Sequence, residues 1–107
     1  CSMVGYDRAD QIVEGFRAMG LDVGRDFFKV RCDHQAVYVE LVKAGAGLGF
    51  MQLRIGRSSP DLVQVLPDLP LPTLPIWLAA PEALRSNPRI RRVFDLLAKG
   101  LQEVCDA

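Results

Sequence analysis

Short strand-like segments alternate with helical patterns along this chain, and this alternation constrains the fold more than any other feature. Strands are expected at residues 3–6, 27–32, 48–51, 62–67 and 76–80. Two helices are expected between the first three of these segments, and another follows the last. Strands that alternate with helices build a sheet covered by helices on both faces, so the pattern predicts the α/β class.

Each expected helix carries an end signal and an apolar stripe. Asp7, Asp33 and Asn87 are expected as N-caps, and Gly20 and Gly45 are expected just past helix ends. The residues expected on buried faces are Ile12, Val13, Phe16 and Met19 in the first helix, Val37, Tyr38, Leu41 and Val42 in the second, and Ile90, Val93, Phe94, Leu97 and Leu101 in the last. These stripes predict one modest core.

The run GAGLG at residues 45–49 resembles a phosphate-binding loop in composition only. Such loops follow a strand and open a helix, so that the helix N-terminus faces the phosphate. Here the run follows a helical pattern and precedes a strand-like one, and Phe50 stands where a third glycine would be needed. The run is therefore predicted to be a helix end and tight turn, with Gly45 in a left-handed conformation.

Charge and composition exclude several classes of function. Thirteen basic residues balance thirteen acidic ones, which argues against binding nucleic acid through bulk charge. No apolar run reaches the ~18–20 residues that a membrane crossing needs. Cys1, Cys32 and Cys105 are odd in number and far apart, which favours a reducing cytoplasm. With one histidine in the chain, a histidine-based metal site or catalytic triad lacks members, so no metal, cofactor or enzyme activity is expected.

The order of four stretches carries a family resemblance. They are VGYDRADQIVEGFRAMG, FFKVRCDHQAVYVELVKAGAGLGFM, DLVQVLPDLPLPTLPIWLAAPEALRSNPRIRRVFDLLAKGL and, within the second of these, the helix followed by the GLG turn. In order and spacing the chain resembles the effector-binding region of bacterial LysR-type transcriptional regulators, which have the periplasmic-binding-protein type 2 fold. The resemblance implies that residues 1–80 are the second α/β subdomain and that residues 81–107 cross back to the first. It also implies DNA binding only through a winged-helix domain absent from this chain. The apolar faces of residues 76–80 and 88–101 would then lack partners, which predicts a homo-oligomer.

The resemblance places a small-molecule effector in a cleft between the two subdomains. Effector contacts are then expected at the start of the second helix and after the glycine turn, at Asp33, His34, Gln35, Ala36, Met51 and Gln52. A helix N-terminus offers free N–H groups to a small polar or anionic metabolite. The negative charge of Asp33 favours an amine or a neutral polar effector instead, and the alternative is that Asp33 only caps the helix. For Met51 the alternative is core packing.

Two other functions stay open from the sequence. A solute-binding protein of a transport system shares the fold, and a small α/β enzyme fits the class. The absence of a recognisable base, nucleophile or cofactor motif counts against the enzyme. The resemblance of LRSNPRIRRVFDLL to the regulators' closing helix counts against the transport protein.

Overall fold

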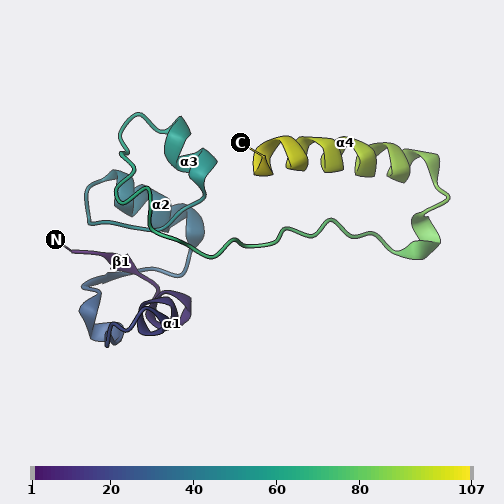
Figure 1. Cartoon of the computed structure of the whole chain (residues 1–107). Coiled ribbons are helices and arrows are strands. Elements are labelled where there is room, and N and C mark those ends of the chain that lie inside the picture. The colour runs from purple at the N-terminus through teal and green to yellow at the C-terminus, as the bar shows by residue number, and fades with distance from the viewer. Residues whose placement is uncertain (1, 107) are drawn as a thin grey trace. The chain divides into compact units, whose positions relative to one another are not determined.

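The computed structural model describes residues 2–106, which form two compact units that divide between Val63 and Gln64. The elements of the first unit are β1 (Val4–Gly5), α1 (Gln11–Ala18), β2 (Val30–Arg31), α2 (Gln35–Lys43) and α3 (Leu53–Ser58) (Figure 1). The second unit contains α4 (Pro88–Cys105). Short 3₁₀ helices lie at Arg25–Phe27 and Glu82–Leu84. None of the helices within residues 2–106 combines the length and apolar character that a membrane crossing requires.

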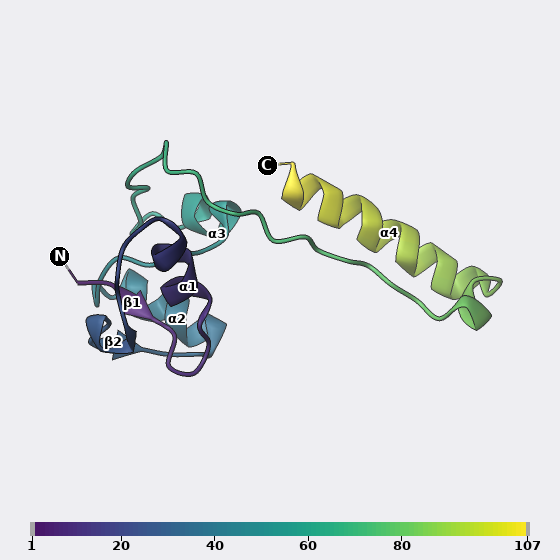
Figure 2. The same cartoon turned by 60° about the horizontal axis from the view of Figure 1, so that its bottom comes forward.

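The first unit is built on parallel pairing. β1 pairs with β2 in the register Val4 to Val30, and the two strands lie side by side in Figure 2. On its other edge, β1 forms a parallel bridge from Met3 to Leu48. β2 and Leu48 therefore flank β1, and each connection between these parallel segments contains a helix. This arrangement confirms the α/β prediction for the first unit.

Successive residues in β1 and directly after it point to opposite faces of the strands, and both faces are packed. On one face, the Tyr6 ring lies against Tyr38 of α2, with ring centroids 5.3 Å apart. On the other face, a Cβ on Gly5 would come within 2.5–2.8 Å of Phe28. Phe28 in turn lies 6.2 Å from Phe16 of α1. α1 and α2 thus cover opposite faces of the strands, as the view in Figure 1 also shows.

Four side chains form the buried core of the first unit. They are Val4, Ile12, Phe28 and Tyr38. Most of the predicted apolar stripe packs against them, but Met19 and Val37 are almost half exposed, so their predicted burial is wrong. Sequence spacing identifies a helix face, whereas the edge of that face depends on how far the neighbouring elements reach.

Tyr38 explains why the predicted strand at 48–51 does not form. The parallel ladder begins normally, with the Leu48 N–H donating to Ser2 and the Val4 N–H donating to Leu48. The next rung would join the Phe50 N–H to the Val4 carbonyl. Instead the Tyr38 hydroxyl donates to the Val4 carbonyl and accepts from the Phe50 N–H, each over 3.0 Å. A side-chain oxygen therefore takes the place of the direct rung.

Other predicted element ends shift for local reasons. The predicted strand at 27–32 is reduced to β2, because a 3₁₀ helix occupies Arg25–Phe27. The sequence patterns do not predict α3, near whose end the Ile55 carbonyl accepts from the Ser58 and Ser59 hydroxyls. A six-residue helix contains too few turns for its periodicity to stand out in sequence.

Two predicted N-caps are wrong because their carboxylates are used elsewhere. α1 begins after Asp10, and Asp7 is instead paired with arginine side chains. α2 begins after His34, whose ring Nδ1 accepts from the Val37 N–H over 3.4 Å. The Asp33 carboxylate accepts from a different loop, described below.

The glycine run is a helix end and turn, as predicted. Gly45 has φ +83°, and its N–H donates to Val42 while the next N–H donates to Leu41, which is a Schellman motif. A Cβ on Gly47 would lie 2.6 Å from the Ser2 carbonyl oxygen. A Cβ on Gly49 would lie 2.4 Å from the Val42 side chain and 2.9 Å from the Tyr38 hydroxyl. The glycines therefore serve close packing of the chain against itself.

The second unit lacks the two strands that the sequence predicts. Within the described residues, neither 62–67 nor 76–80 pairs with another strand, and Pro67 lies in a turn. A strand needs a partner edge to satisfy its backbone groups, and none of the described residues supplies one here. Leu66 also has φ +52° immediately before a proline, which interrupts an extended run.

The last helix begins as predicted but is not buried as predicted. The Asn87 side chain accepts from the Arg89 and Ile90 N–H groups, with Pro88 at the first helical position. No residue of α4 is fully buried, and Val93 and Leu97 are 55% and 50% exposed. The amphipathic face is present, but the described residues cover only part of it.

Candidate functional site

Three loops follow the carboxyl ends of the parallel segments. Residues 6–10 follow β1, residues 32–34 follow β2, and residues 49–52 follow the bridge at Leu48. Because parallel segments end at the same edge of a sheet, all three loops belong to one edge. In open α/β folds, ligands bind outside the carboxyl ends of the strands. All six residues that the sequence analysis selected lie in these loops or in the first turn of α2.

Asp33 joins two of these loops. Its Oδ1 accepts from the Asp7 N–H over 2.9 Å and from the Ala9 N–H over 3.3 Å, and its Oδ2 accepts from the Arg8 N–H over 3.0 Å. The partners lie 24–26 residues earlier in the chain. The carboxylate thus ties the loop after β1 to the start of α2.

Asp7 is held by two arginines at the same edge. Its carboxylate forms ion pairs with Arg25 and with Arg31 Nε, the latter over 3.3 Å. The hydrogen bond from Arg25 lowers the pKa of Asp7, and the same bond raises the pKa of Arg25. Arg31 Nη1 also donates to the Phe28 carbonyl over 3.1 Å, which fixes the guanidinium beside the 3₁₀ helix.

The first turn of α2 presents exposed polar groups. His34, Gln35 and Ala36 are all exposed. The Val37 N–H is capped by His34, and the Tyr38 N–H donates to the His34 carbonyl. No partner within residues 2–106 accepts from the Gln35 or Ala36 N–H groups. These two donors are therefore free to bind a ligand oxygen.

Met51 and Gln52 are the last two residues of the third loop. The Phe50 N–H just before them is anchored by Tyr38, which lies one turn into α2. Gln52 is exposed at the N-cap position of α3, without a side-chain capping bond. Met51 is half-buried, and its sulfur would lie 3.8 Å from a Cβ on Gly56, so Met51 also packs against α3. The topology assigns both residues to the same edge as Asp33, and both roles considered for Met51 stay open.

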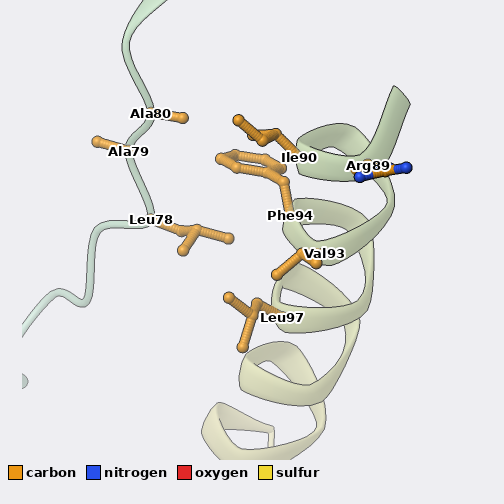
Figure 3. Close-up of a pocket in the computed structure, with 8 residues that line it drawn as sticks. All are labelled: Leu78, Ala79, Ala80, Arg89, Ile90, Val93, Phe94 and Leu97. Carbon is orange, nitrogen blue, oxygen red and sulfur yellow. The ribbon is translucent and has the colours of Figure 1, made fainter. Parts of the chain in front are cut away.

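A separate apolar hollow lies in the second unit. Its volume is about 330 Å³, and Figure 3 shows Ile90, Val93, Phe94 and Leu97 of α4 pointing toward Leu78 and Ala80. Arg89 is the only charged residue among those that line it. A hollow with almost no polar group is suited to hydrophobic packing rather than to orienting a polar metabolite.

The sequence analysis did not select the loop at Asp7, Arg8 and Ala9 as part of the site. The signal in the sequence is the segment YDRAD directly after the first strand, with three charged residues, of which Asp7 is expected as a helix cap. Charged residues at the carboxyl end of a parallel strand also mark the ligand edge of an α/β sheet. The helix begins only at Gln11, so Asp7 belongs to the loop.

The arrangement supports binding more directly than catalysis. Hydrogen-bond donors, an exposed amide side chain and a braced loop meet at one edge. The described residues contain no group of three or more histidine, cysteine or acidic side chains that could hold a metal ion. Cys32 and Cys105 are free thiols, while Cys1 lies outside the described residues.

Comparison with known proteins gives one family. The model of the LysR substrate binding domain matches residues 3–102, which is almost the whole chain. No curated protein and no solved structure matches the chain significantly. Domains of this family have a periplasmic-binding-protein-like type 2 fold and belong to DNA-binding regulators that respond to small-molecule effectors, rather than to enzymes. This chain therefore belongs to the LysR substrate binding domain family, as an effector-binding domain of a LysR-type transcriptional regulator.

Proposed function

We propose that this chain binds a small polar or anionic metabolite in a cleft between two subdomains and so controls a transcriptional regulator. The observation that carries the proposal is the meeting of three loops at the carboxyl edge of the parallel segments. Residues 1–80 are proposed as the second subdomain, which extends beyond the first compact unit that ends at Val63. Residues 81–107 are proposed to cross back to the first subdomain, and a winged-helix domain of the regulator is proposed to contact DNA.

The donors at the start of α2 favour an anionic or neutral effector. The Gln35 and Ala36 N–H groups lie at the positive end of the helix, where a carboxylate or a carbonyl oxygen is stabilised. The Asp33 carboxylate already accepts from three N–H groups. It therefore has fewer free lone pairs for an amine than the sequence alone suggested.

The exposed side of α4 fits the proposed crossover. Val93 and Leu97 are about half exposed, so the described residues cover them only in part. An apolar face of this kind is normally covered by another subdomain or another copy of the chain. The same face supports the proposal that the regulator is a homo-oligomer.

The test is an effector screen on the regulator with both subdomains present. A panel of carboxylic acids, amino acids and neutral polar metabolites is screened by thermal shift, and hits are titrated by calorimetry. Gln35→Ala keeps the backbone N–H but removes the side-chain amide, which is proposed to add its own hydrogen bond to the effector when the two subdomains close over it. The change should weaken binding by about 0.5–3 kcal/mol, the range for losing a hydrogen bond at a buried site. Glu40→Ala is the matched control, because Glu40 is exposed on the same helix and pairs only with Lys43 at the surface.

The affinities of these variants show whether the effector binds at this edge of the sheet or elsewhere. Weaker binding for Gln35→Ala and Ala36→Trp, with normal binding for Glu40→Ala and unchanged melting curves, supports the proposal. Equal affinity in all four proteins would place the effector elsewhere.

A further inference from the structure

We infer that Asp33 is a positioning residue, which fastens the loop at residues 7–9 to the start of α2. The inference rests on the proposed function, which makes this edge of the sheet the effector site. The contact can be tested without an effector, because it joins two parts of the chain itself.

The contact uses three successive backbone donors. The N–H groups of Asp7, Arg8 and Ala9 all point at one carboxylate, over 2.9–3.3 Å. Consecutive N–H groups that converge in this way form a backbone nest, a concavity suited to an anion. In this protein the anion is the Asp33 side chain.

No other strong partner competes for the Asp33 carboxylate. The ion pairs at this edge, among the described residues, join Arg25 and Arg31 to Asp7 and Asp26, and none includes Asp33. Hydrogen bonds from N–H groups to a charged oxygen are stronger than neutral ones. Removal of this one carboxylate would therefore leave three donors without their acceptor at once.

The contact fixes the geometry of the site more than the stability of the core. Asp33 and Arg8 are exposed, and Asp7 and Ala9 are only partly buried. The core consists of other residues, among them Val4, Phe28 and Tyr38. Loss of the carboxylate should free the loop after β1 while leaving the strands and α2 in place. A site whose loops are held in advance loses less conformational entropy when a ligand binds.

The experiment measures amide exchange residue by residue with NMR on the purified chain. Asp33→Ala should raise the exchange rates of the Asp7, Arg8 and Ala9 amides by about tenfold or more, since hydrogen bonds to a charged group protect these amides. The Val4 amide in β1 should keep its rate. Asp10→Ala is the matched control, because Asp10 is an exposed acid beside the same loop and makes no side-chain capping bond.

Chemical rescue distinguishes a positioned carboxylate from a general structural role. Sodium acetate added to Asp33→Ala should occupy the emptied nest and slow the three amides again, whereas sodium chloride at equal ionic strength should not. Unchanged exchange in Asp33→Ala would overturn the inference, and so would an equal rise at Val4 or equal rescue by both salts. Since no step uses an effector, these failures leave the proposed effector site untouched, and a failed effector screen leaves the positioning role untouched.

Discussion

Replacement of Tyr38 by phenylalanine removes one oxygen that connects three parts of the first unit. The ring is fully buried, and phenylalanine keeps its shape and its contact with Tyr6. The hydroxyl, however, donates to the Val4 carbonyl and accepts from the Phe50 N–H. The change therefore leaves one backbone acceptor and one backbone donor without a partner.

The expected cost follows from these two groups. A polar group left unsatisfied in the interior costs about 1–3 kcal/mol, so two such groups predict a loss of roughly 2–6 kcal/mol in the free energy of unfolding. Domains of this size are typically stable by about 5–15 kcal/mol, so the loss is a substantial part of the total. Van der Waals packing should change little, because the ring remains.

Urea unfolding followed by far-UV circular dichroism measures this cost. Trp77 fluorescence is unsuitable, because Trp77 is 86% exposed in the second unit and does not report on this core. Tyr6→Phe is the control, because the described residues provide no hydrogen bond to its hydroxyl while its ring packs on Tyr38. The control should lose much less stability than Tyr38→Phe.

One result would refute this reasoning. If Tyr38→Phe cost less than about 0.5 kcal/mol, the Phe50 N–H and the Val4 carbonyl would have to close the parallel rung directly or bind water. The bridging hydroxyl would then not be what holds this part of the ladder.

Three further predictions concern the glycine turn, pH and association. Gly45→Val should lower the free energy of unfolding by roughly 1–3 kcal/mol through strain at a positive φ, measured by the same urea titration, and a neutral effect would contradict the left-handed assignment. Burial raises the pKa of Tyr38 above the ordinary value of 10.0, so its contribution to stability is complete below pH 10 and falls as pH rises through the folded pKa. The free energy of unfolding, measured at several values above pH 10, should therefore fall less steeply with pH for Tyr38→Phe than for wild type. The exposed apolar face of α4 predicts association, which sedimentation velocity should show as concentration dependence that Leu97→Glu reduces, whereas a wild-type monomer at all concentrations would count against it.

Local patterns in the sequence predict three of the four α-helices in the described residues, α1, α2 and α4. The Asn87 cap, the proline after it and the left-handed Gly45 each depend on one or two residues and their own backbone, so the structure has them as predicted. The alternation of apolar segments likewise predicts the α/β class, because it reflects the periods of helix and strand. The site residues from Asp33 to Ala36 are placed at the expected helix start, while their binding role stays a prediction.

Partner choice is what the sequence alone could not decide. Asp7 and Asp33 are both good caps by composition, yet arginines hold the first and a loop some 25 residues away holds the second. The predicted strand at 48–51 depended on an ordinary ladder, and a tyrosine hydroxyl from α2 enters that ladder instead. Hydrogen-bond propensity is local, but the partner that satisfies a group is set by the three-dimensional path of the whole chain. For the same reason the predicted strands at 62–67 and 76–80 stay unpaired: their sequence favours extension, and only a neighbouring edge can turn an extended segment into a strand.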